Sequence, residues 1–301
     1  MKHLISTKQF TDAKKLEEIF QLADKYSEGD TFEVLEHKII ACIFYEPSTR
    51  TRLSFETAAL RLGAQIISTE NATLFSSAAK GETLEDAIKI ISSYADAIVL
   101  RHYQKGASKL ASIVSSVPII NAGDGAGEHP TQALLDLYTI KKELGRIEGL
   151  KIALVGDLLN GRTIHSLINL LSIYDSNILY LVSPEGLKLP PSCKKILNNK
   201  KIKFVEEINL TEVLDEIDVL YMTRIQKERF KNIEEYEKVK DVYCLDHKAV
   251  QHMKKKSIIM HPLPRINEIA TNVDNDERAA YFSQAKNGLF IRMAILDLLL
   301  N

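Results

Sequence analysis

Short apolar runs alternate with segments of helical periodicity along the first half of the chain. The apolar runs predict four strands, at residues 38–44, 65–68, 96–100 and 117–121. The segments between them predict helices at about 51–62, 82–93 and 105–115, followed by a longer helix from Pro130 to about Leu144. Because parallel strands need a long crossover that is usually a helix, this alternation predicts a parallel sheet built from βαβ units.

The same alternation restarts after Gly149. Apolar runs there predict a second sheet, with strands at 151–157, 177–183, 201–207, 218–223, 242–245 and 257–260. The sequence GRIEG at 145–149 marks the boundary, since two glycines close a helix just before a strand. Residues 283–301 carry apolar side chains at helical spacing. We therefore expect an α/β protein of two domains, each a parallel β-sheet flanked by helices.

Charge composition excludes some classes of function. The 301 residues include 39 Lys and Arg against 40 Asp and Glu, so the net charge is −1. This balance argues against a nucleic-acid partner, which normally requires a basic excess on one face. Any recognition of anions must therefore come from local clusters of basic residues.

Cysteine usage and hydropathy bear on compartment and cofactors. The three cysteines, Cys42, Cys193 and Cys244, lie far apart and form no CxxC pair, which argues against a zinc site and favours a reducing compartment. The N-terminus lacks the apolar core of a signal peptide, and no apolar run approaches the ~20 residues of a membrane span. We expect a cytoplasmic protein that needs no metal or cofactor and has no membrane partner.

The first candidate site is PSTRTR at 47–52, where a strand gives way to a helix. Ser48 or Thr49 can cap this helix, and the unpaired N–H groups of a helix start attract anions. With the Arg50 guanidinium and the Thr51 hydroxyl, the segment can form a phosphate cradle. Alternatively, Ser48 only caps the helix and both arginines are solvated. We expect Arg52 to pair with acidic side chains of the protein, and Glu46 and Glu82 are the candidates.

The second candidate is NAGDGAGEHPTQ at 121–132. Its glycines have GxGxG spacing, which is not the dinucleotide fingerprint. Pro130 suits the first position of a helix, which places His129 beside the helix N-terminus. A histidine there tends to remain neutral and can donate a hydrogen bond to a carbonyl oxygen. The alternative is a histidine that caps its own loop.

Further candidates follow strands of the second sheet. Arg162 lies just inside a helix, and Arg224 and Gln226 are alternate residues, so in an extended segment both point the same way. HPLP at 261–264 predicts an irregular turn whose free carbonyls can accept hydrogen bonds from an NH₂ group. The alternatives are surface arginines and a rigid turn without chemistry. Ligands of open α/β sheets bind at the carboxyl ends of strands, so these clusters can converge.

These motifs, with RLSFETAALRLGA, AKGETLEDAI, LYMTRIQKERF, MHPLPRINEI and YFSQAKNG, resemble in order those of the aspartate carbamoyltransferase catalytic chain over nearly the whole sequence. Ornithine carbamoyltransferases share STRT and HP-Q but typically have His-Cys-Leu-Pro at the turn. The resemblance implies the aspartate/ornithine carbamoyltransferase fold. It also implies transfer of a carbamoyl group from carbamoyl phosphate to the amino group of L-aspartate, in pyrimidine synthesis.

The resemblance assigns roles by position. Carbamoyl phosphate would be held through its phosphate by Ser48, Thr49, Arg50, Thr51 and Arg101, and its carbonyl would be polarised by Thr51, Arg101 and His129. Its NH₂ group would be held by Gln132 and by the backbone carbonyls of Pro262 and Leu263, in a turn whose Leu263–Pro264 bond is cis. Aspartate would be bound through its α-carboxylate by Arg162 and through its β-carboxylate by Arg224 and Gln226.

The resemblance also implies an organisation. Residues 1–130 would bind carbamoyl phosphate, completed by helix 283–301, and 131–144 would form an interdomain helix before an aspartate-binding domain at 145–282. Ser76 and Lys80 would reach into the site of a neighbouring subunit of a homotrimer. From composition alone, the loop that carries them can also be an ordinary surface loop. A separate regulatory chain is a possible further partner. Leu159 and Asn160 depart from the Lys-Tyr common in the family, so allosteric behaviour is not carried over.

Three alternatives remain open at this point. The acceptor can be another amine, such as ornithine, although Arg224 would repel a cationic side chain. A nucleotide-binding dehydrogenase is less favoured because the glycine fingerprint is missing. A catalytically silent assembly partner is disfavoured because every motif position is filled.

Overall fold

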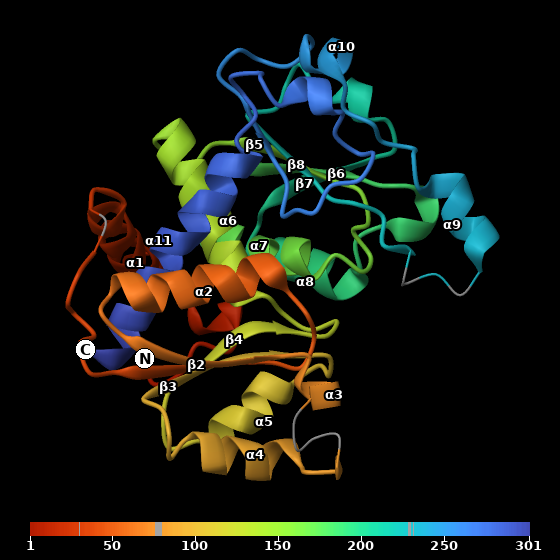
Figure 1. Cartoon of the computed structure of the whole chain (residues 1–301). Helices are drawn as coiled ribbons and strands as arrows, with labels where there is room; N and C mark the ends of the chain where they lie inside the picture. Colours follow the sequence, from red (N-terminus) through yellow and green to blue (C-terminus); the bar gives the residue numbers. More distant parts are fainter. Residues whose placement is uncertain (30, 76–79, 228–229, 231) are drawn as a thin grey trace. The chain divides into compact units, whose positions relative to one another are not determined.

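The computed structural model describes residues 1–29, 31–75, 80–227, 230 and 232–301 (Figure 1). The contacts divide the chain into two units. Unit 1 comprises Met1–Leu135 and Lys286–Asn301, and unit 2 comprises Asp136–Ala285. The chain passes from one unit to the other within helices α6 (Pro130–Leu144) and α11 (Tyr281–Leu300).

Unit 1 contains a four-stranded sheet in the order β2-β1-β3-β4, and every neighbouring pair is parallel. Its strands are β1 (Ile39–Phe44), β2 (Gln65–Glu70), β3 (Ala97–His102) and β4 (Ile119–Asp124). Strands β1 and β3 lie inside the sheet and are almost completely buried, which explains why their sequences read as continuous apolar runs.

Helices cover both faces of this sheet (Figure 1). They are α1 (Ala13–Ser27), α2 (Thr49–Arg61), α3 (Ala72–Phe75), α4 (Leu84–Ile91) and α5 (Ala107–Val114). Helices α4 and α5 pack on one face, where Ile88 and Ala111 join the apolar side chains of β1 and β3. Helix α2 lies on the opposite face, so its first turn is fixed relative to the strand that precedes it.

A buried arginine fixes the C-terminal part of α11 against α2. Arg292 is 4% exposed. Its Nη1 donates a 2.9 Å hydrogen bond to Ser54 Oγ, and its guanidinium lies 5.1 Å from the centre of the Phe55 ring. Because Ser54 and Phe55 belong to α2, the C-terminal helix supports the element that starts with the PSTRTR motif.

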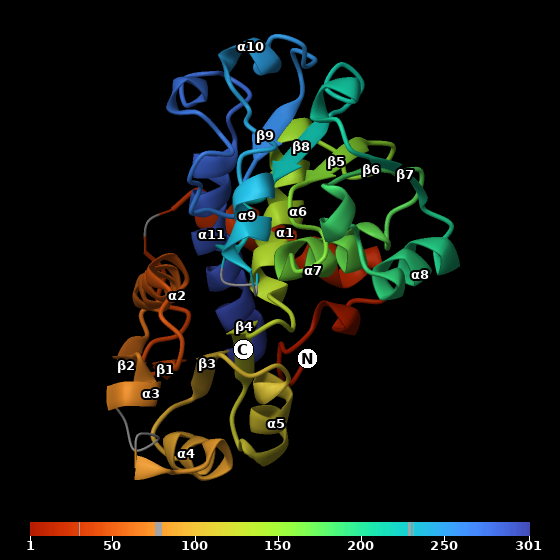
Figure 2. The same cartoon turned by 90° about the vertical axis from the view of Figure 1, so that its right-hand side faces the viewer.

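Unit 2 contains a five-stranded parallel sheet in the order β7-β6-β5-β8-β9 (Figure 2). Its strands are β5 (Lys151–Val155), β6 (Ile178–Val182), β7 (Lys203–Glu207), β8 (Val219–Met222) and β9 (Ile258–Met260). The predicted class of two parallel sheets flanked by helices is confirmed.

One predicted strand is wrong. Residues 242–245 form no strand, and only Leu245 makes an isolated bridge, to Ile269. The segment is apolar because Tyr243 and Leu245 bury their side chains in the core of unit 2 from an irregular backbone. Alternating burial without a neighbouring strand gives the same sequence pattern as a strand.

The helices of unit 2 are α7 (Arg162–Leu171), α8 (Pro191–Asn199), α9 (Ile233–Val239) and α10 (His247–Val250). Helices α7 and α8 lie on one side of the sheet and α10 on the other (Figure 2). Short 3-10 helices lie at Thr7–Gln9, Glu185–Leu187, Leu210–Glu212 and Thr271–Val273.

A glycine directly after β5 allows two strand ends of unit 2 to approach each other. Gly156 has φ +117, and a Cβ on it would lie 2.3 Å from the carbonyl oxygen of Thr223, which follows β8. Both the backbone conformation and the space therefore require glycine at this position.

We expect Gly156→Ala to lower the free energy of unfolding by about 2 kcal/mol or more, because it adds a clash to a disfavoured backbone conformation. Gly186→Ala is the matched control. A Cβ there meets no atom within 4 Å, so its effect should stay within about 0.5 kcal/mol. Urea unfolding of both variants is the measurement, and equal stabilities would contradict this account of Gly156.

Candidate active site

In unit 1 the carboxyl ends of β1, β3 and β4 lie side by side, because the three strands are adjacent and parallel. Phe44 of β1 is aligned with Arg101 of β3, and the Tyr45 N–H donates a 2.9 Å hydrogen bond to the Arg101 carbonyl oxygen. The PSTRTR segment after β1 and the arginine that ends β3 therefore share one edge of the sheet.

The first turn of α2 presents hydroxyl groups. Ser48 occupies the N-cap position, but its side chain makes no capping hydrogen bond. Instead Ser48 Oγ donates to Thr51 Oγ1 at 3.0 Å, and Thr51 is buried. The expected position of Ser48 at the start of the helix is therefore confirmed, but its side chain does not cap the helix. The N–H groups of the first turn remain oriented towards the carboxyl edge of the sheet.

The two arginines of the motif differ in their surroundings. Arg52 pairs with Glu56 and Glu70, at 3.2 Å each. The expectation that Arg52 pairs with protein acids is confirmed, but the choice of Glu46 or Glu82 is wrong, because one turn of helix and the end of β2 supply nearer carboxylates. Within the described parts of the chain, Arg50 has no hydrogen bond or ion pair. Partial burial lowers the pKa of Arg50, since desolvation disfavours the charged guanidinium.

Arg101 and His129 meet over a glycine. Arg101 is 7% exposed, and its Nη1 donates a 3.2 Å hydrogen bond to the Ala122 carbonyl oxygen. A Cβ on Gly123 (φ +116) would lie 2.9 Å from Arg101 Nη1 and 3.5 Å from His129 Cδ2. The positive φ favours glycine here, and an added Cβ would also crowd the Arg101 guanidinium.

The same guanidinium has an acidic neighbour that the sequence analysis did not place in the site. Glu46 Oε1 lies 3.4 Å from Arg101 Nη2. The sequence shows Glu46 only as an acidic residue directly before PSTRTR, because its partner Arg101 lies on another strand. Glu46 therefore partly offsets the charge of the Arg101 guanidinium.

His129 lies at the start of a helix, as predicted. Helix α6 begins at Pro130, and His129 is buried. Gln132 belongs to the first turn and is also mostly buried, and its N–H donates to the His129 carbonyl oxygen at 3.1 Å. The structure therefore brings His129, Gln132 and Arg101 to the same edge of unit 1 as the start of α2.

The loop before α4 is described in part. Ser76 lies outside the described residues, whereas Lys80 is described and exposed. Thr83 caps α4 by accepting a 3.2 Å hydrogen bond from the Asp86 N–H.

In unit 2 the adjacent strands β5, β8 and β9 carry the remaining candidates at their carboxyl ends. Arg162 is the first residue of α7, after β5. Asn160, two residues earlier, binds the buried Asp157, which accepts from the Asn160 N–H at 2.9 Å and from its side-chain amide at 3.1 Å. Asn160 therefore braces the turn that leads into Arg162.

Arg224 and Gln226 follow β8 in an extended segment. Both side chains are half-buried, whereas the side chain of Ile225 between them is buried, so burial alternates along the segment. This alternation agrees with two side chains that point in one direction.

The HPLP turn follows β9. The Leu263–Pro264 bond is cis, as expected, and Leu263 has φ 51. The carboxylate of Glu268 makes three contacts with the turn and the residues after it. Its Oε1 lies 2.7 Å from His261 Nε2, and its Oε2 accepts hydrogen bonds from the N–H groups of Ile266 (3.0 Å) and Asn267 (3.1 Å). Glu268 was not predicted, because its role depends on the path of the chain after the turn.

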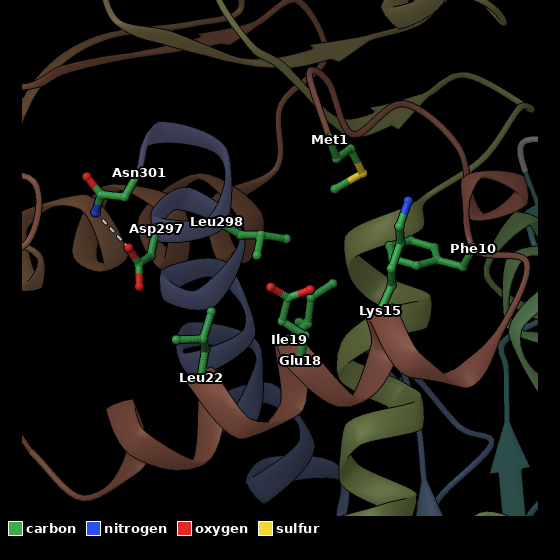
Figure 3. A pocket seen from close by; sticks show the side chains of 9 residues that line it. All are labelled: Met1, Phe10, Lys15, Glu18, Ile19, Leu22, Asp297, Leu298 and Asn301. Carbon is green, nitrogen blue, oxygen red and sulfur yellow. Dashed lines mark hydrogen bonds between the residues drawn. The ribbon is translucent and has the colours of Figure 1, made fainter.

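A cavity of unit 1 lies away from these candidates. It is lined by Met1, Phe10 and side chains of α1 and α11 (Figure 3), and none of its lining residues belongs to the predicted binding set. Over the described ranges, no group of three or more His, Cys, Asp or Glu side chains is arranged to hold a metal ion. In the same ranges, no helix combines the length and apolar character needed to cross a membrane.

Both parallel sheets carry basic side chains at or just after the carboxyl ends of their strands, where anionic ligands can be bound. Residues 2–142 match the carbamoyl-phosphate-binding domain of aspartate/ornithine carbamoyltransferases, and residues 148–299 match the Asp/Orn-binding domain. The chain belongs to the aspartate/ornithine carbamoyltransferase family.

Relatives within this family are aspartate carbamoyltransferases. The catalytic subunit of Methanocaldococcus jannaschii is 53% identical, over 100% of this chain and 98% of the relative, and the chloroplastic enzyme of Arabidopsis thaliana is 51% identical, over 99% and 77%. The Trypanosoma cruzi aspartate transcarbamoylase in complex with carbamoyl phosphate and aspartate superposes with a TM-score of 0.93 at 40% identity, over 100% of this chain and 97% of that one. The resemblance seen in the motifs is confirmed.

We expect the stability of the protein to depend on Glu268 at acidic pH. Burial by itself raises the pKa of Glu268, but hydrogen bonds from His261 and from backbone N–H groups outweigh it and lower the pKa below its ordinary 4.5. The stability that the carboxylate contributes is therefore fully present above about pH 4.5 and is lost as the pH falls through the lowered pKa.

Glu268→Gln should therefore flatten the decline of the urea midpoint as the pH falls below about 4.5. Glu277→Gln, at an exposed glutamate, is the control and should leave the decline unchanged. An identical pH dependence in wild type and Glu268→Gln would show that the carboxylate does not carry this effect.

Proposed function

We propose that this chain catalyses the transfer of the carbamoyl group from carbamoyl phosphate to the amino group of L-aspartate. The products are N-carbamoyl-L-aspartate and phosphate, in an early step of de novo pyrimidine biosynthesis. The observation that carries the proposal is the meeting of Arg101 and His129 over Gly123, at the strand edge where α2 begins. A carbonyl group with an attached phosphate fits such a set of donors.

The phosphate is bound at the start of α2 by Ser48, Thr49, Arg50 and Thr51. The helix start supplies N–H groups and the positive end of the helix dipole. Arg50 supports this assignment because, in the described part of the chain, its charge is not neutralised by a protein carboxylate. Arg52 is excluded from substrate contact by its two glutamates.

The carbonyl oxygen is polarised by Thr51, Arg101 and His129. These groups donate hydrogen bonds to an oxygen that becomes negative in the tetrahedral intermediate, and loss of one such donor typically costs about 10²–10³ in rate. The bound substrate competes with Glu46 for the Arg101 guanidinium. Gln132 and the backbone carbonyls of Pro262 and Leu263, in the turn that Pro264 closes, hold the NH₂ group of the carbamoyl moiety.

Aspartate is bound by Arg162 through its α-carboxylate and by Arg224 and Gln226 through its β-carboxylate. Its neutral amine attacks the carbonyl carbon, and the tetrahedral intermediate collapses with cleavage of the bond to the phosphate oxygen. The departing phosphate takes the proton that the amine loses. Orienting two anions that repel each other in water supplies much of the rate enhancement.

The charge of Arg224 favours aspartate over ornithine as the acceptor. A guanidinium stabilises the β-carboxylate of aspartate and repels the side-chain ammonium of ornithine. The turn sequence His261-Pro262-Leu263-Pro264 likewise follows the aspartate branch of the family.

The protein is proposed to work as a homotrimer in the cytoplasm, with Ser76 and Lys80 completing the site of a neighbouring subunit. The exposed position of Lys80 supports this assignment, and three free cysteines agree with a reducing compartment. A relative of this chain is named a catalytic subunit, which supports a separate regulatory chain as a possible partner.

Substitution of one arginine from each unit should affect different substrates. Arg50→Ala should lower kcat/KM for carbamoyl phosphate by about 10²-fold or more, because a charged contact to the phosphate is lost. Arg224→Ala should raise the KM for aspartate and lower kcat, because the β-carboxylate loses its partner. Steady-state kinetics with each substrate varied in turn is the measurement.

Arg146→Ala, at an exposed arginine outside the proposed site, is the control for both variants and should retain wild-type kinetics. Normal use of carbamoyl phosphate by Arg50→Ala would remove the phosphate assignment. Unchanged aspartate kinetics in Arg224→Ala would remove the β-carboxylate assignment.

Mixed trimers test the shared site. Arg50→Ala and Lys80→Ala chains should each be nearly inactive, but an equal mixture that is unfolded and reassembled should recover about a quarter of wild-type activity, because a quarter of the shared sites then contain both intact residues. The absence of recovery in mixtures shown to contain mixed trimers would indicate that each chain carries its own complete site.

A further inference from the structure

The turn after β9 contains a residue in an unusual conformation. Leu263 has φ 51, in the left-handed region that non-glycine residues rarely adopt. Such conformations persist where the surroundings enforce them, and they concentrate at functional sites. The side chains that hold Leu263 in place are therefore of interest.

His261 makes two hydrogen bonds with its ring. Its Nδ1 lies 2.8 Å from the Leu263 backbone nitrogen, and its Nε2 lies 2.7 Å from Glu268 Oε1. His261 is 2% exposed and Glu268 is 7% exposed, so water does not compete for these contacts. The ring bridges the left-handed residue and a buried carboxylate.

The geometry fixes the tautomer of His261. The Leu263 N–H can only donate, so Nδ1 must accept and carries no proton. The single ring proton is then on Nε2, where it is donated to the Glu268 carboxylate. The contact from Nδ1 to the N–H two residues further on reproduces the Asx-turn that asparagine and aspartate side chains form.

Both ends of the turn are anchored to other elements of unit 2. At the start, the His261 N–H donates to Gln284 Oε1 at 2.9 Å, and Gln284 Nε2 donates to Asp136 Oδ1 at 2.6 Å. At the end, Arg265 Nη2 donates to Asp274 Oδ2 at 2.6 Å. With the backbone held on both sides, the orientation of Leu263 depends on the bond from its N–H to His261.

We propose that His261 is a positioning residue, which holds Leu263 in the left-handed conformation so that the carbonyl groups of Pro262 and Leu263 face the carbamoyl NH₂ group. His261 does not touch the substrate, and Glu268 keeps its ring in the required tautomer. The inference rests on the proposed function, because only that function gives these carbonyl groups a ligand.

Two substitutions separate the roles of the two ring nitrogens. His261→Asn places an amide oxygen where Nδ1 lies and can restore the bond to the Leu263 N–H, although it cannot reach Glu268. His261→Gln can reach towards Glu268 but places its acceptor one bond too far for the turn. The two variants remove the same imidazole, so loss of its packing is common to both.

We expect His261→Gln to lower kcat/KM for carbamoyl phosphate by about 10- to 100-fold, the range for a lost buried hydrogen bond that orients a substrate contact. His261→Asn should recover most of this loss. Both variants should leave the KM for aspartate, measured at saturating carbamoyl phosphate, within about twofold of wild type. The reason is that a lost side-chain hydrogen bond mainly affects the residues in direct contact with it. Equal kinetics in the two folded variants would overturn the inference.

The tautomer supplies a readout that does not depend on activity. In the ¹⁵N–¹H spectrum of the wild-type protein at neutral pH, the ring signal that disappears in His261→Asn should be that of a neutral imidazole protonated on Nε2. A signal protonated on Nδ1, or on both nitrogens, would overturn the inference. If the wild-type protein makes no carbamoyl-aspartate, the proposed function fails, whereas this spectrum still decides the state of His261.

Discussion

Parallel strand pairing is the constraint on which the rest of the structure depends. Because every pair in both sheets is parallel, the strands of each sheet all end at one edge, and the segments that follow neighbouring strands are brought together. In unit 1 these segments carry PSTRTR, Arg101 and His129, and in unit 2 they carry Arg162, Arg224 and the HPLP turn. Residues far apart in the sequence thereby form two compact sets, one in each unit.

Glycines at these edges make the close approaches possible. Gly123 and Gly156 have nearly the same positive φ, +116 and +117; an added Cβ would lie 2.9 Å from the Arg101 guanidinium at Gly123 and 2.3 Å from the Thr223 carbonyl oxygen at Gly156. The two arginines of the PSTRTR motif differ in their ion pairs. Arg52 is paired with Glu56 and Glu70, whereas among the described residues no ion pair is found for Arg50.

The sequence predicted those features that depend on local patterns. Apolar runs indicated all nine strands of the described residues to within a few residues, and Pro130 indicated the start of α6 beside His129. Residues 242–245 were mistaken for a strand, because alternating burial alone does not reveal whether a neighbouring strand is present. Helices α1, α8 and α9 were not predicted, although α1 and α8 bury apolar side chains at helical spacing; α9 buries no side chain.

The sequence also did not predict the ion pairs and hydrogen bonds between residues that lie far apart along the chain. The acids that pair with Arg52, the contact of Glu46 with Arg101, and the link from Gln284 to Asp136 across 148 positions all depend on the folded path of the chain. The family resemblance indicated which side chains would face the substrates, but it did not indicate how His261 and Glu268 hold the turn.

The acceptor specificity of the purified protein tests the central claim most directly. With carbamoyl phosphate as donor and L-aspartate and L-ornithine offered together, the products can be separated and identified by mass. The account predicts that N-carbamoyl-L-aspartate forms with release of an equal amount of phosphate, and that carbamoylated ornithine does not accumulate. Carbamoylation of ornithine in preference to aspartate, or no carbamoyl transfer to either amine, would contradict it.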